Sequence, residues 1–491
     1  MERSLVTLFR DASTRFAERT AIIDGGRSIR YETLSKWAAA AASFLRKEGL
    51  RPGDRVAILV PNSAEYAAIY YGILAAGGAV VALNTAAKAR DLSNWVAHSE
   101  CRWLFAQANH PELGELLANV AGPIRVVEVG DTAGELGTAL DDIFAAGGGF
   151  ERHPTGDEAE TLAAIIYTSG TTGRPKGVML SHANLYSNTR SIIRYLGIDC
   201  EDRVLNVLPF YYSYGNSVLH THLAVGGTVL LENSLLYPHR VLERLVVERA
   251  TGFSGVPATF ALLLNRTRLE SYDLSSVRYL TQAGGPMAPA SIERLRAAIP
   301  HADFYVMYGQ TEAAARLSYL PPERLTEKMG SIGIAIPDVE LDIRDEQQNS
   351  VPPRVTGEIC ARGPNVMMGY WRDPEMTATV LRGGWLRTGD LAYRDPDGYY
   401  YIVGRSSEMI KSGAHRVSPK EIEEVILELP GVEEVAAIGV PDELLGETIK
   451  VVVVPASADA PSKRAIQAHC RANLAVYKIP KSVEFATEIP K

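Results

Sequence analysis

The sequence predicts an α/β protein: a large N-terminal domain of mostly parallel sheets flanked by helices, and a small α+β C-terminal domain. Its 491 residues exceed what one compact core usually holds. From Tyr31 onward, short apolar strands alternate with helical stretches, which is typical of βαβ units. The pattern changes near residues 393–404, after which the chain is a smaller βα-rich segment. We therefore expect domains at residues 1–403 and 404–491.

The large domain begins with predicted helices and strands that alternate along the chain. Residues 33–47 carry apolar side chains at helical spacing, and Gly49 ends that helix. A strand over 55–60, a helix over 63–76 and a strand over 79–83 follow. The same alternation predicts four later strands, at 203–208, 227–231, 277–283 and 303–307.

Two regions further along the chain are predicted less simply. Residues 110–160 have the weakest pattern, and the small residues at 145–149 indicate a flexible surface connection. In the C-terminal domain, Ser418 is expected to cap a helix, with Pro419 in its first turn and Glu421 reaching back to the cap.

Charge and cysteine usage narrow the class of protein. A net charge of −8 argues against nucleic acid or an anionic membrane as partner, because both need a basic surface. The four cysteines are scattered without CxxC spacing, so we expect reduced thiols rather than disulfides or zinc. No apolar run reaches the length of a membrane span, and Met1-Glu2-Arg3 does not begin a signal peptide. These features favour a cytoplasmic protein without a membrane span.

The stretch from Thr168 to Gly177 is the most informative part of the chain. Apolar residues 163–167 predict a buried strand before it, and residues 177–180 a second strand after it, with Ser181 capping the next helix. Glycines, hydroxyls and two cations together predict a loop that holds a polyphosphate. A P-loop of the ATPase type is excluded, since Gly177 follows Lys176 where Ser or Thr is needed. The candidate phosphate-binding residues are Thr168, Ser169, Gly170, Thr171, Thr172, Gly173 and Lys176.

This loop resembles the signature of the adenylate-forming superfamily, which includes acyl-CoA synthetases, carrier-loading adenylation domains and luciferases. Further segments resemble the family's other motifs in the family's order: 308–312 (YGQTE), 357–371, 387–390 (RTGD) and 404–421. The resemblance covers nearly the whole chain. It implies that residues 1–403 are an AMP-binding domain with the acyl and ATP sites, and that 404–491 are the family's mobile C-terminal domain.

The resemblance also implies roles for individual residues. The phosphate loop would grip the β- and γ-phosphates of ATP, Thr311 would hold the α-phosphate, and Glu312 would bind Mg²⁺. Asp390 would accept the ribose hydroxyls, Arg405 would contact the ribose, and Arg416 would lie near the phosphates. The implied catalytic residues are Lys176, Thr311, Glu312 and Arg416, and further nucleotide contacts would come from Gly284, Gly285, Pro286, Tyr308 and Gly309.

The sequence indicates the residues of the acyl site less clearly than those of the nucleotide site. Residues 208–215 resemble the family's substrate-side motif, and Tyr212 stands where amino-acid-activating members carry Asp. Because a tyrosine cannot pair a buried ammonium, a carboxylic acid without a free α-amino group is favoured. The candidate substrate-binding residues are Tyr212, Gly215, Gly284 and Tyr308. His220 and His222 are interpreted as packing rather than a metal pair, since no acidic partner lies nearby in the sequence.

Three C-terminal positions depart from the family pattern. The hinge position falls on Ser407, where Asp or Lys is more usual, and the glycine that lines the pantetheine path is replaced by Ala414. The family's C-terminal lysine would lie a short distance beyond Lys491, so we expect a tail that this sequence does not include.

Taken together, these features predict an acid–thiol ligase using ATP, Mg²⁺ and CoA. It would convert a small-molecule carboxylic acid to acyl-AMP, release pyrophosphate and pass the acyl group to CoA. Two alternatives remain open: an acyl-AMP ligase that loads the phosphopantetheine of an acyl carrier protein, and an inactive acyl- or nucleotide-binding homologue. The protein is expected to be a monomer or homodimer.

Overall fold

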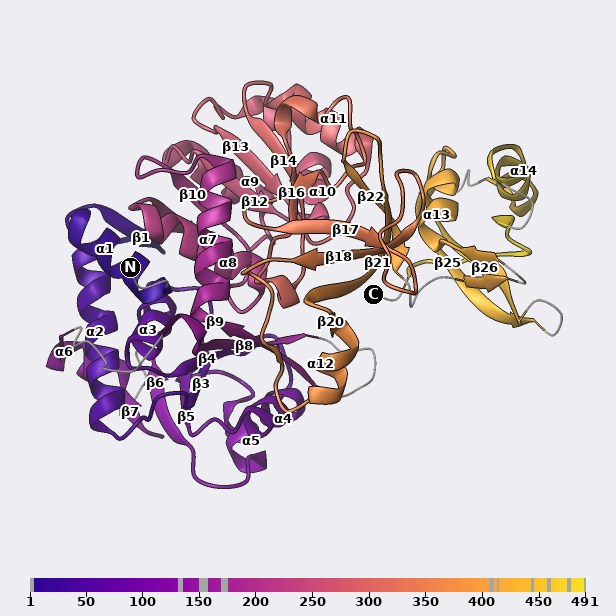
Figure 1. Cartoon of the computed structure of the whole chain (residues 1–491). Helices are drawn as coiled ribbons and strands as arrows, with labels where there is room; N and C mark the ends of the chain where they lie inside the picture. Colours follow the sequence, from indigo (N-terminus) through magenta and orange to yellow (C-terminus); the bar gives the residue numbers. More distant parts are fainter. Residues whose placement is uncertain are drawn as a thin grey trace. The chain divides into compact units, whose positions relative to one another are not determined.

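The computed structural model describes residues 4–130, 136–149, 158–168, 175–405, 410–412, 415–442, 446–456, 461–474 and 478–489, with backbone only at 158, 411, 412, 415, 416 and 446. The chain forms two compact units (Figure 1). Unit 1 contains Met1–Leu341 and Ala361–Leu386, and unit 2 contains Asp342–Cys360 and Arg387–Lys491. The predicted α/β class is confirmed, whereas a division between 403 and 404 stays a prediction.

Unit 1 contains an eight-stranded sheet, two strands of which precede and follow the predicted phosphate loop. Its order is β19 (Gly369–Tyr370), β9 (Lys176–Ser181), β8 (Leu162–Thr168), β4 (Ala79–Ala82), β3 (Arg55–Leu59), β5 (Trp103–Gln107), β6 (Arg125–Val129) and β7 (Thr138–Ala139). All pairs are parallel except β8–β9 and β9–β19. The helices of this part of the chain are α1 (Leu5–Arg15), α2 (Tyr31–Lys47), α3 (Ala64–Ala75), α4 (Ala89–Ser99), α5 (Leu113–Asn119) and α6 (Leu140–Ala146).

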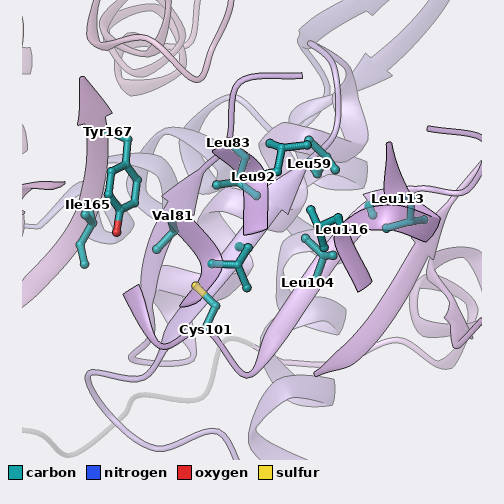
Figure 2. Packing of buried hydrophobic residues seen from close by; sticks show 13 residues of the cluster. Leu59, Val81, Leu83, Leu92, Cys101, Leu104, Leu113, Leu116, Ile165 and Tyr167 are labelled. Atoms are coloured by element: carbon teal, nitrogen blue, oxygen red, sulfur yellow. The ribbon is translucent and has the colours of Figure 1, made fainter. Parts of the chain in front are cut away.

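A cluster of buried apolar side chains packs this sheet against helices α4 and α5 (Figure 2). Leu59, Val81 and Leu104 come from three adjacent parallel strands, and Ile165 and Tyr167 come from β8. Each fully buried apolar side chain contributes roughly 1.5–3 kcal/mol. The strand that leads into the phosphate loop is therefore part of the core.

A nine-stranded sheet forms the other half of unit 1. Its order is β16 (Ile334–Ala335), β15 (Ser318–Leu320), β14 (Asp303–Tyr308), β13 (Tyr279–Gln282), β12 (Gly252–Gly255), β10 (Arg203–Asn206), β11 (Thr228–Leu231), β1 (Thr20–Asp24) and β2 (Arg27–Arg30). The strands from β14 to β1 are parallel. Connecting helices are α7 (His182–Leu196), α8 (Ser213–Val225), α9 (Pro238–Val247), α10 (Pro257–Arg266) and α11 (Pro289–Ala298).

Two smaller sheets follow. The first has the order β17 (Glu340–Arg344), β18 (Gly357–Arg362), β21 (Trp385–Arg394) and β20 (Leu381–Arg382), with β22 (Tyr400–Arg405) also on β21 and α12 (Pro374–Val380) preceding β20. The second has the order β24 (His415–Val417), β23 (Ile410–Ser412), β26 (Gly446–Pro455) and β25 (Val432–Asp442), with β27 (Ser482–Phe485) also on β26. Helices α13 (Pro419–Leu427) and α14 (Lys463–Asn473) contribute Ile422, Ile426, Ile466 and Cys470 to the core of this last sheet.

The strands and helices predicted outside residues 110–160 are present with small shifts at their ends, but two predictions were wrong. Ala145 and Ala146 end helix α6, so residues 145–149 are not all a surface connection. Ser418 occupies the N-cap position of α13 without a side-chain cap, because its hydroxyl donates to the Val403 carbonyl at 2.5 Å. Glu421 does not reach back to the cap, since its carboxylate binds the Lys478 ammonium at 2.5 and 2.6 Å.

No helix in the described part of the chain is long and apolar enough to cross a membrane.

The two histidines on α8 are buried, and each lies within hydrogen-bonding distance of a tyrosine hydroxyl. His222 Nε2 lies 2.7 Å from the Tyr279 hydroxyl, and His220 Nδ1 lies 2.9 Å from the Tyr71 hydroxyl. Burial lowers the pKa of His220 to about 3 and that of His222 to about 4. Both rings are therefore neutral packing groups at neutral pH.

The turn after β14 brings two backbone segments into close contact. A Cβ added to Gly309 would lie 2.1 Å from the Ala315 carbonyl oxygen and 2.7 Å from the Arg316 Cα. Ala314 and Ala315 have φ angles of 56° and 119°, which non-glycine residues rarely adopt. The Asn365 amide holds the turn by donating to the Arg316 carbonyl at 2.9 Å.

Gly309→Ala should lower the free energy of unfolding by about 2–3 kcal/mol, because the added methyl meets backbone that has no room to move. Urea denaturation is the measurement. Gly114→Ala is the matched control: no atom lies within 4 Å of a Cβ added there, in helix α5. The control should gain about 0.5–1 kcal/mol. A Gly309→Ala protein as stable as the wild type would contradict the close contact.

His220 should make stability fall in mild acid. Its folded-state pKa is about 3, whereas the unfolded ring titrates near 6.5, so between those values only the unfolded chain takes up the proton. The neutral His220 ring makes its full contribution to the free energy of unfolding above pH ~6.5. Below that pH the contribution falls by about 1.4 kcal/mol per pH unit. Between pH 7 and pH 5, urea denaturation should show the wild type losing about 2 kcal/mol more than His220→Gln.

The exposed His239 provides the control for this measurement. His239→Gln makes the same substitution at an exposed position and controls for the change of side chain itself. Equal pH dependence in His220→Gln and the wild type would show that His220 does not stay neutral in the folded protein.

Candidate active site

The predicted phosphate loop closes a β-hairpin. β8 and β9 pair antiparallel with Thr168 opposite Lys176, so both ends of the loop lie at one point of the sheet. The Ser181 hydroxyl accepts from the Asn184 N–H at 3.2 Å, and the Asn184 side chain accepts from the Ser181 N–H at 2.8 Å, which starts α7. The two predicted strands and the capped helix after them are confirmed. Ser169, Gly170, Thr171, Thr172 and Gly173 lie outside the described residues.

β19 adds a third strand to this hairpin. Tyr370 pairs with Val178, and the Trp371 N–H donates to the Gly177 carbonyl at 2.7 Å. A Cβ added to Gly177 would lie 2.9 Å from Ile165 Cγ2 and 3.3 Å from Trp371 Cβ. The glycine after Lys176 is thus packed between β8 and the segment 369–371, and the hairpin is held from both sides.

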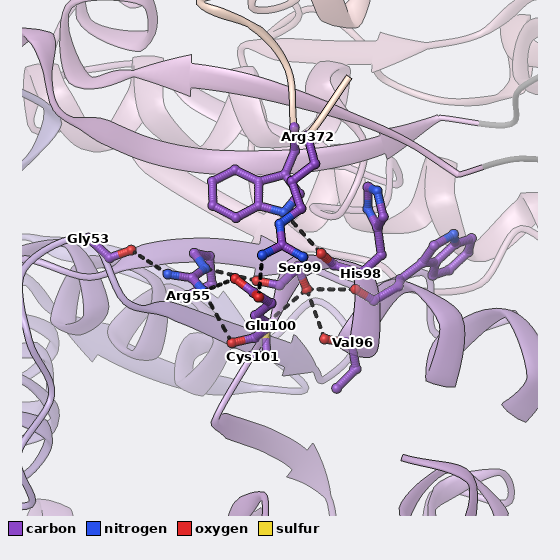
Figure 3. Close-up of polar contacts among 10 residues, drawn as sticks. Gly53, Arg55, Val96, His98, Ser99, Glu100, Cys101 and Arg372 are labelled. Atoms are coloured by element: carbon purple, nitrogen blue, oxygen red, sulfur yellow. Dashed lines mark hydrogen bonds and ion pairs between the residues drawn. The ribbon is translucent and has the colours of Figure 1, made fainter. Parts of the chain in front are cut away.

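The Trp371 indole is held by a network of contacts, in which Figure 3 labels Arg55, His98, Glu100 and Arg372. Its Nε1–H donates to the His98 carbonyl at 2.9 Å, and the Arg55 guanidinium lies 5.0 Å from the ring centroid. Arg55 in turn lies 3.0 Å from Glu100 Oε2, and Arg372 pairs with Glu100 Oε1. A cation–π contact of this kind contributes roughly 0.5–2 kcal/mol. The network fixes the residue next to Tyr370.

Tyr370 connects the hairpin to Glu312. Its hydroxyl donates to Glu312 Oε1 at 2.8 Å, and the Met367 N–H donates to the Glu312 carbonyl at 2.9 Å. Burial and the neighbouring carboxylate raise the pKa of Tyr370 well above its ordinary value, so the phenol remains a proton donor. Among the described residues, no hydrogen bond reaches Glu312 Oε2. One carboxylate oxygen is therefore oriented, and the other is available to a cation.

Thr311 lies beside the substrate-side segment. The short helix η3 (Thr311–Ala313) packs against β9, and the Thr311 hydroxyl lies 3.4 Å from Ser213 Oγ at the start of α8. Tyr212, just before α8, is 49% exposed. A Cβ added to Gly215 would lie 2.2 Å from the Pro209 carbonyl oxygen, so packing alone requires this glycine.

The segment after β13 is exposed as a nucleotide or acyl contact requires. Gly284, Gly285 and Pro286 are all solvent-exposed. Gly284 has a φ of +88°, and the Gln282 amide donates to the Gly285 carbonyl at 2.7 Å, which fixes the turn. Tyr308, at the end of β14, is half-buried.

In unit 2, Asp390 and Arg405 face each other across β21 and β22. Arg405 Nε lies 3.2 Å from Asp390 Oδ1, with the arginine side chain 61% exposed and the aspartate side chain 9% exposed. Glu358 holds the turn before Asp390 by accepting from the Gly389 N–H at 3.0 Å and the Arg387 Nε–H at 2.8 Å. The two residues predicted to contact the ribose are therefore neighbours.

Several predicted residues of the C-terminal segment are not described in full. Arg416 pairs with Lys411 across β24 and β23, and only its backbone is described. Ser407, Ala414 and Lys491 lie outside the described residues.

Sequence reasoning missed Tyr370, Glu358 and Arg316, a buried arginine four residues after Glu312. Tyr370 and Glu358 lie inside the segment 357–371, but no local pattern tells which side chain meets a residue far away in the sequence. A charged residue after the alanine run 313–315 was the only signal for Arg316.

Comparisons with known proteins identify relatives along nearly the whole chain. The chain is 37% identical to the feruloyl-CoA synthase of an Amycolatopsis species over 479 residues, which cover 96% of this chain and 92% of that protein. It is 33% identical over 526 residues to the long-chain-fatty-acid–CoA ligase of Salmonella typhimurium, covering 100% and 92%. The solved structure of o-succinylbenzoate CoA synthetase from Bacillus subtilis with its acyl-adenylate intermediate superposes with a TM-score of 0.85 at 27% identity, covering 99% and 95%.

Residues 9–371 match the AMP-binding enzyme family, and residues 421–491 match the AMP-binding enzyme C-terminal domain. The chain belongs to the AMP-binding enzyme family, in its acyl-CoA synthetase branch.

Proposed function

We propose that this AMP-forming acyl-CoA ligase joins a carboxylic acid lacking a free α-amino group to CoA, through an acyl-AMP intermediate and with release of pyrophosphate. The observation that carries the proposal is the Tyr370–Glu312 hydrogen bond of 2.8 Å, made by a strand that pairs with the phosphate hairpin. It connects a carboxylate suited to a metal ion and a loop suited to phosphates through one rigid backbone.

The residues fit a magnesium ion that arrives with ATP. No group of three or more His, Cys, Asp or Glu in the described chain could hold a metal by itself. Mg²⁺ usually takes one or two carboxylates together with substrate phosphates, so Glu312 Oε2 suffices on the protein side. Bound there, the ion would neutralise charge on the phosphates. Lys176 and the loop 168–173 would hold the β- and γ-phosphates, and Thr311 the α-phosphate.

The acyl group would lie along Tyr212, Gly215, Gly284 and Tyr308. Tyr212 offers no carboxylate for an ammonium group, which supports an acid without an α-amino group. Ferulate and long-chain fatty acids, the acids named for the two curated relatives, share this property. We place the enzyme in the cytoplasm as a monomer or homodimer.

Asp390 and Arg405 would bind the ribose of the nucleotide. Asp390 has a nearly buried carboxylate next to Arg405, a pair suited to two ribose hydroxyls. Arg416 would approach the phosphates. In this proposal the acyl group is accepted by the thiol of CoA. The alternative acceptor is the phosphopantetheine thiol of a carrier protein.

The proposal is tested with purified protein, ATP and Mg²⁺ against a panel of carboxylic acids, with pyrophosphate release as the readout. Each active acid is then assayed with CoA and, separately, with a phosphopantetheinylated carrier protein. The expected result is thioester formation with CoA. Thioester only on the carrier protein would change the acceptor, and no pyrophosphate with any acid would overturn the activity.

Glu312→Gln should reduce adenylate formation by a hundredfold or more, about 3 kcal/mol in the barrier, because the amide cannot hold the cation beside the leaving pyrophosphate. The fold should persist, since the amide oxygen still accepts from Tyr370. Glu340→Gln, which changes an exposed carboxylate paired with Arg362, is the control and should leave activity unchanged. Near-normal pyrophosphate release by Glu312→Gln would remove Glu312 from the metal site.

A further inference from the structure

Arg316 is a buried cation with no acidic partner in the described part of the chain. Only 3% of its surface is exposed. Its Nη1 donates to the Ala315 carbonyl at 3.2 Å, its Nε lies 3.4 Å from Met307 Sδ, and the guanidinium lies 4.0 Å from the centroid of the Tyr214 ring. Burying a charge without a counter-charge is unfavourable, so arginine in such a place needs a reason.

The neighbouring polar groups do not neutralise this charge. The Tyr214 hydroxyl bonds to the Thr281 carbonyl and hydroxyl, each at 2.9 Å. The amides of Asn188 and Asn365 both donate to the backbone carbonyl of Arg316, at 3.0 and 2.9 Å. These contacts fix where the guanidinium lies and supply no negative charge.

The position of Arg316 indicates what the missing partner is. The residue lies four positions after Glu312, and its guanidinium stacks on Tyr214, the neighbour of Ser213. Ser213 Oγ lies 3.4 Å from the Thr311 hydroxyl, so the start of α8, which carries Tyr214 and belongs to the substrate-side segment, meets the turn that carries Arg316. A planar guanidinium suits a carboxylate through paired hydrogen bonds. An alkyl chain ending there would leave the charge uncompensated.

We propose that Arg316 is a specificity-determining residue that binds a second carboxylate on the acid substrate, at the end remote from the carboxylate that is adenylated. This inference rests on the proposed function. It makes the preferred substrates dicarboxylic acids, or acids with another anionic oxygen group, rather than plain aliphatic acids.

The test compares matched acids that differ only in the second carboxylate: octanoate with suberate, and cinnamate with 4-carboxycinnamate. The wild type should favour the diacid of at least one pair by about a hundredfold in kcat/KM for pyrophosphate release, as expected for a charged hydrogen-bonded pair. Arg316→Met keeps most of the side-chain volume and removes the charge, so it should lose that preference. Arg316→Lys keeps the charge without the planar fork and should retain part of it.

Tyr71→Phe is the structural control, because it removes a 2.9 Å hydrogen bond between buried side chains, to His220 Nδ1, without changing any charge. The control should leave the ratio of diacid to monoacid unchanged. Equal losses for both acids of each pair in Arg316→Met, or a wild type that prefers the monoacids, would overturn the inference. If Arg316→Met does not fold, the ratio measured with Arg316→Lys decides. The proposed function fails separately, if the wild type releases no pyrophosphate with any acid.

Discussion

The candidate site depends on the pairing of β19 with β9. The hydrogen bond from the Trp371 N–H to the Gly177 carbonyl sets the register of that pairing, and the register directs the Tyr370 hydroxyl to Glu312. A shift of one residue would point Tyr370 to the opposite face of the strand. The Trp371 indole, fixed by His98 and Arg55, resists such a shift. The position of Tyr370 is therefore set by strand pairing.

Unfavourable features concentrate around the turn after β14. Two successive alanines adopt positive φ, Gly309 meets the Ala315 carbonyl, and Arg316 buries a charge. Strain and buried charge of this kind persist where the surrounding structure holds them and where function uses them. Here the surrounding structure is Asn188 and Asn365, whose amides hold the turn. The turn carries Glu312 at one end and Arg316 at the other, so one local distortion would serve both metal binding and substrate choice.

The sequence predicted the features that depend on neighbours along the chain. Ser181 and Asn184 form a cap because both partners lie within one helical turn, and the alternation of strands and helices identified most of the parallel sheets. Prediction failed where a distant partner competes. Ser418 stands at a position where serine often caps a helix, but its hydroxyl donates to the Val403 carbonyl instead. The Glu421 carboxylate likewise accepts from the Lys478 ammonium rather than from the cap. Tyr370 could not be assigned for the same reason, since its partner lies 58 residues away in the chain.

The central claim is that Tyr370 positions Glu312 for the metal ion, and Tyr370→Phe tests it most directly. ATP–pyrophosphate exchange should be measured over a Mg²⁺ titration, with Tyr66→Phe as a matched loss of another buried tyrosine hydroxyl. Losing one hydrogen bond to a carboxylate should raise the half-saturating Mg²⁺ concentration about tenfold in Tyr370→Phe, roughly 1.5 kcal/mol. Tyr66→Phe should keep the wild-type value. An unchanged Mg²⁺ requirement in a folded Tyr370→Phe protein would contradict the account.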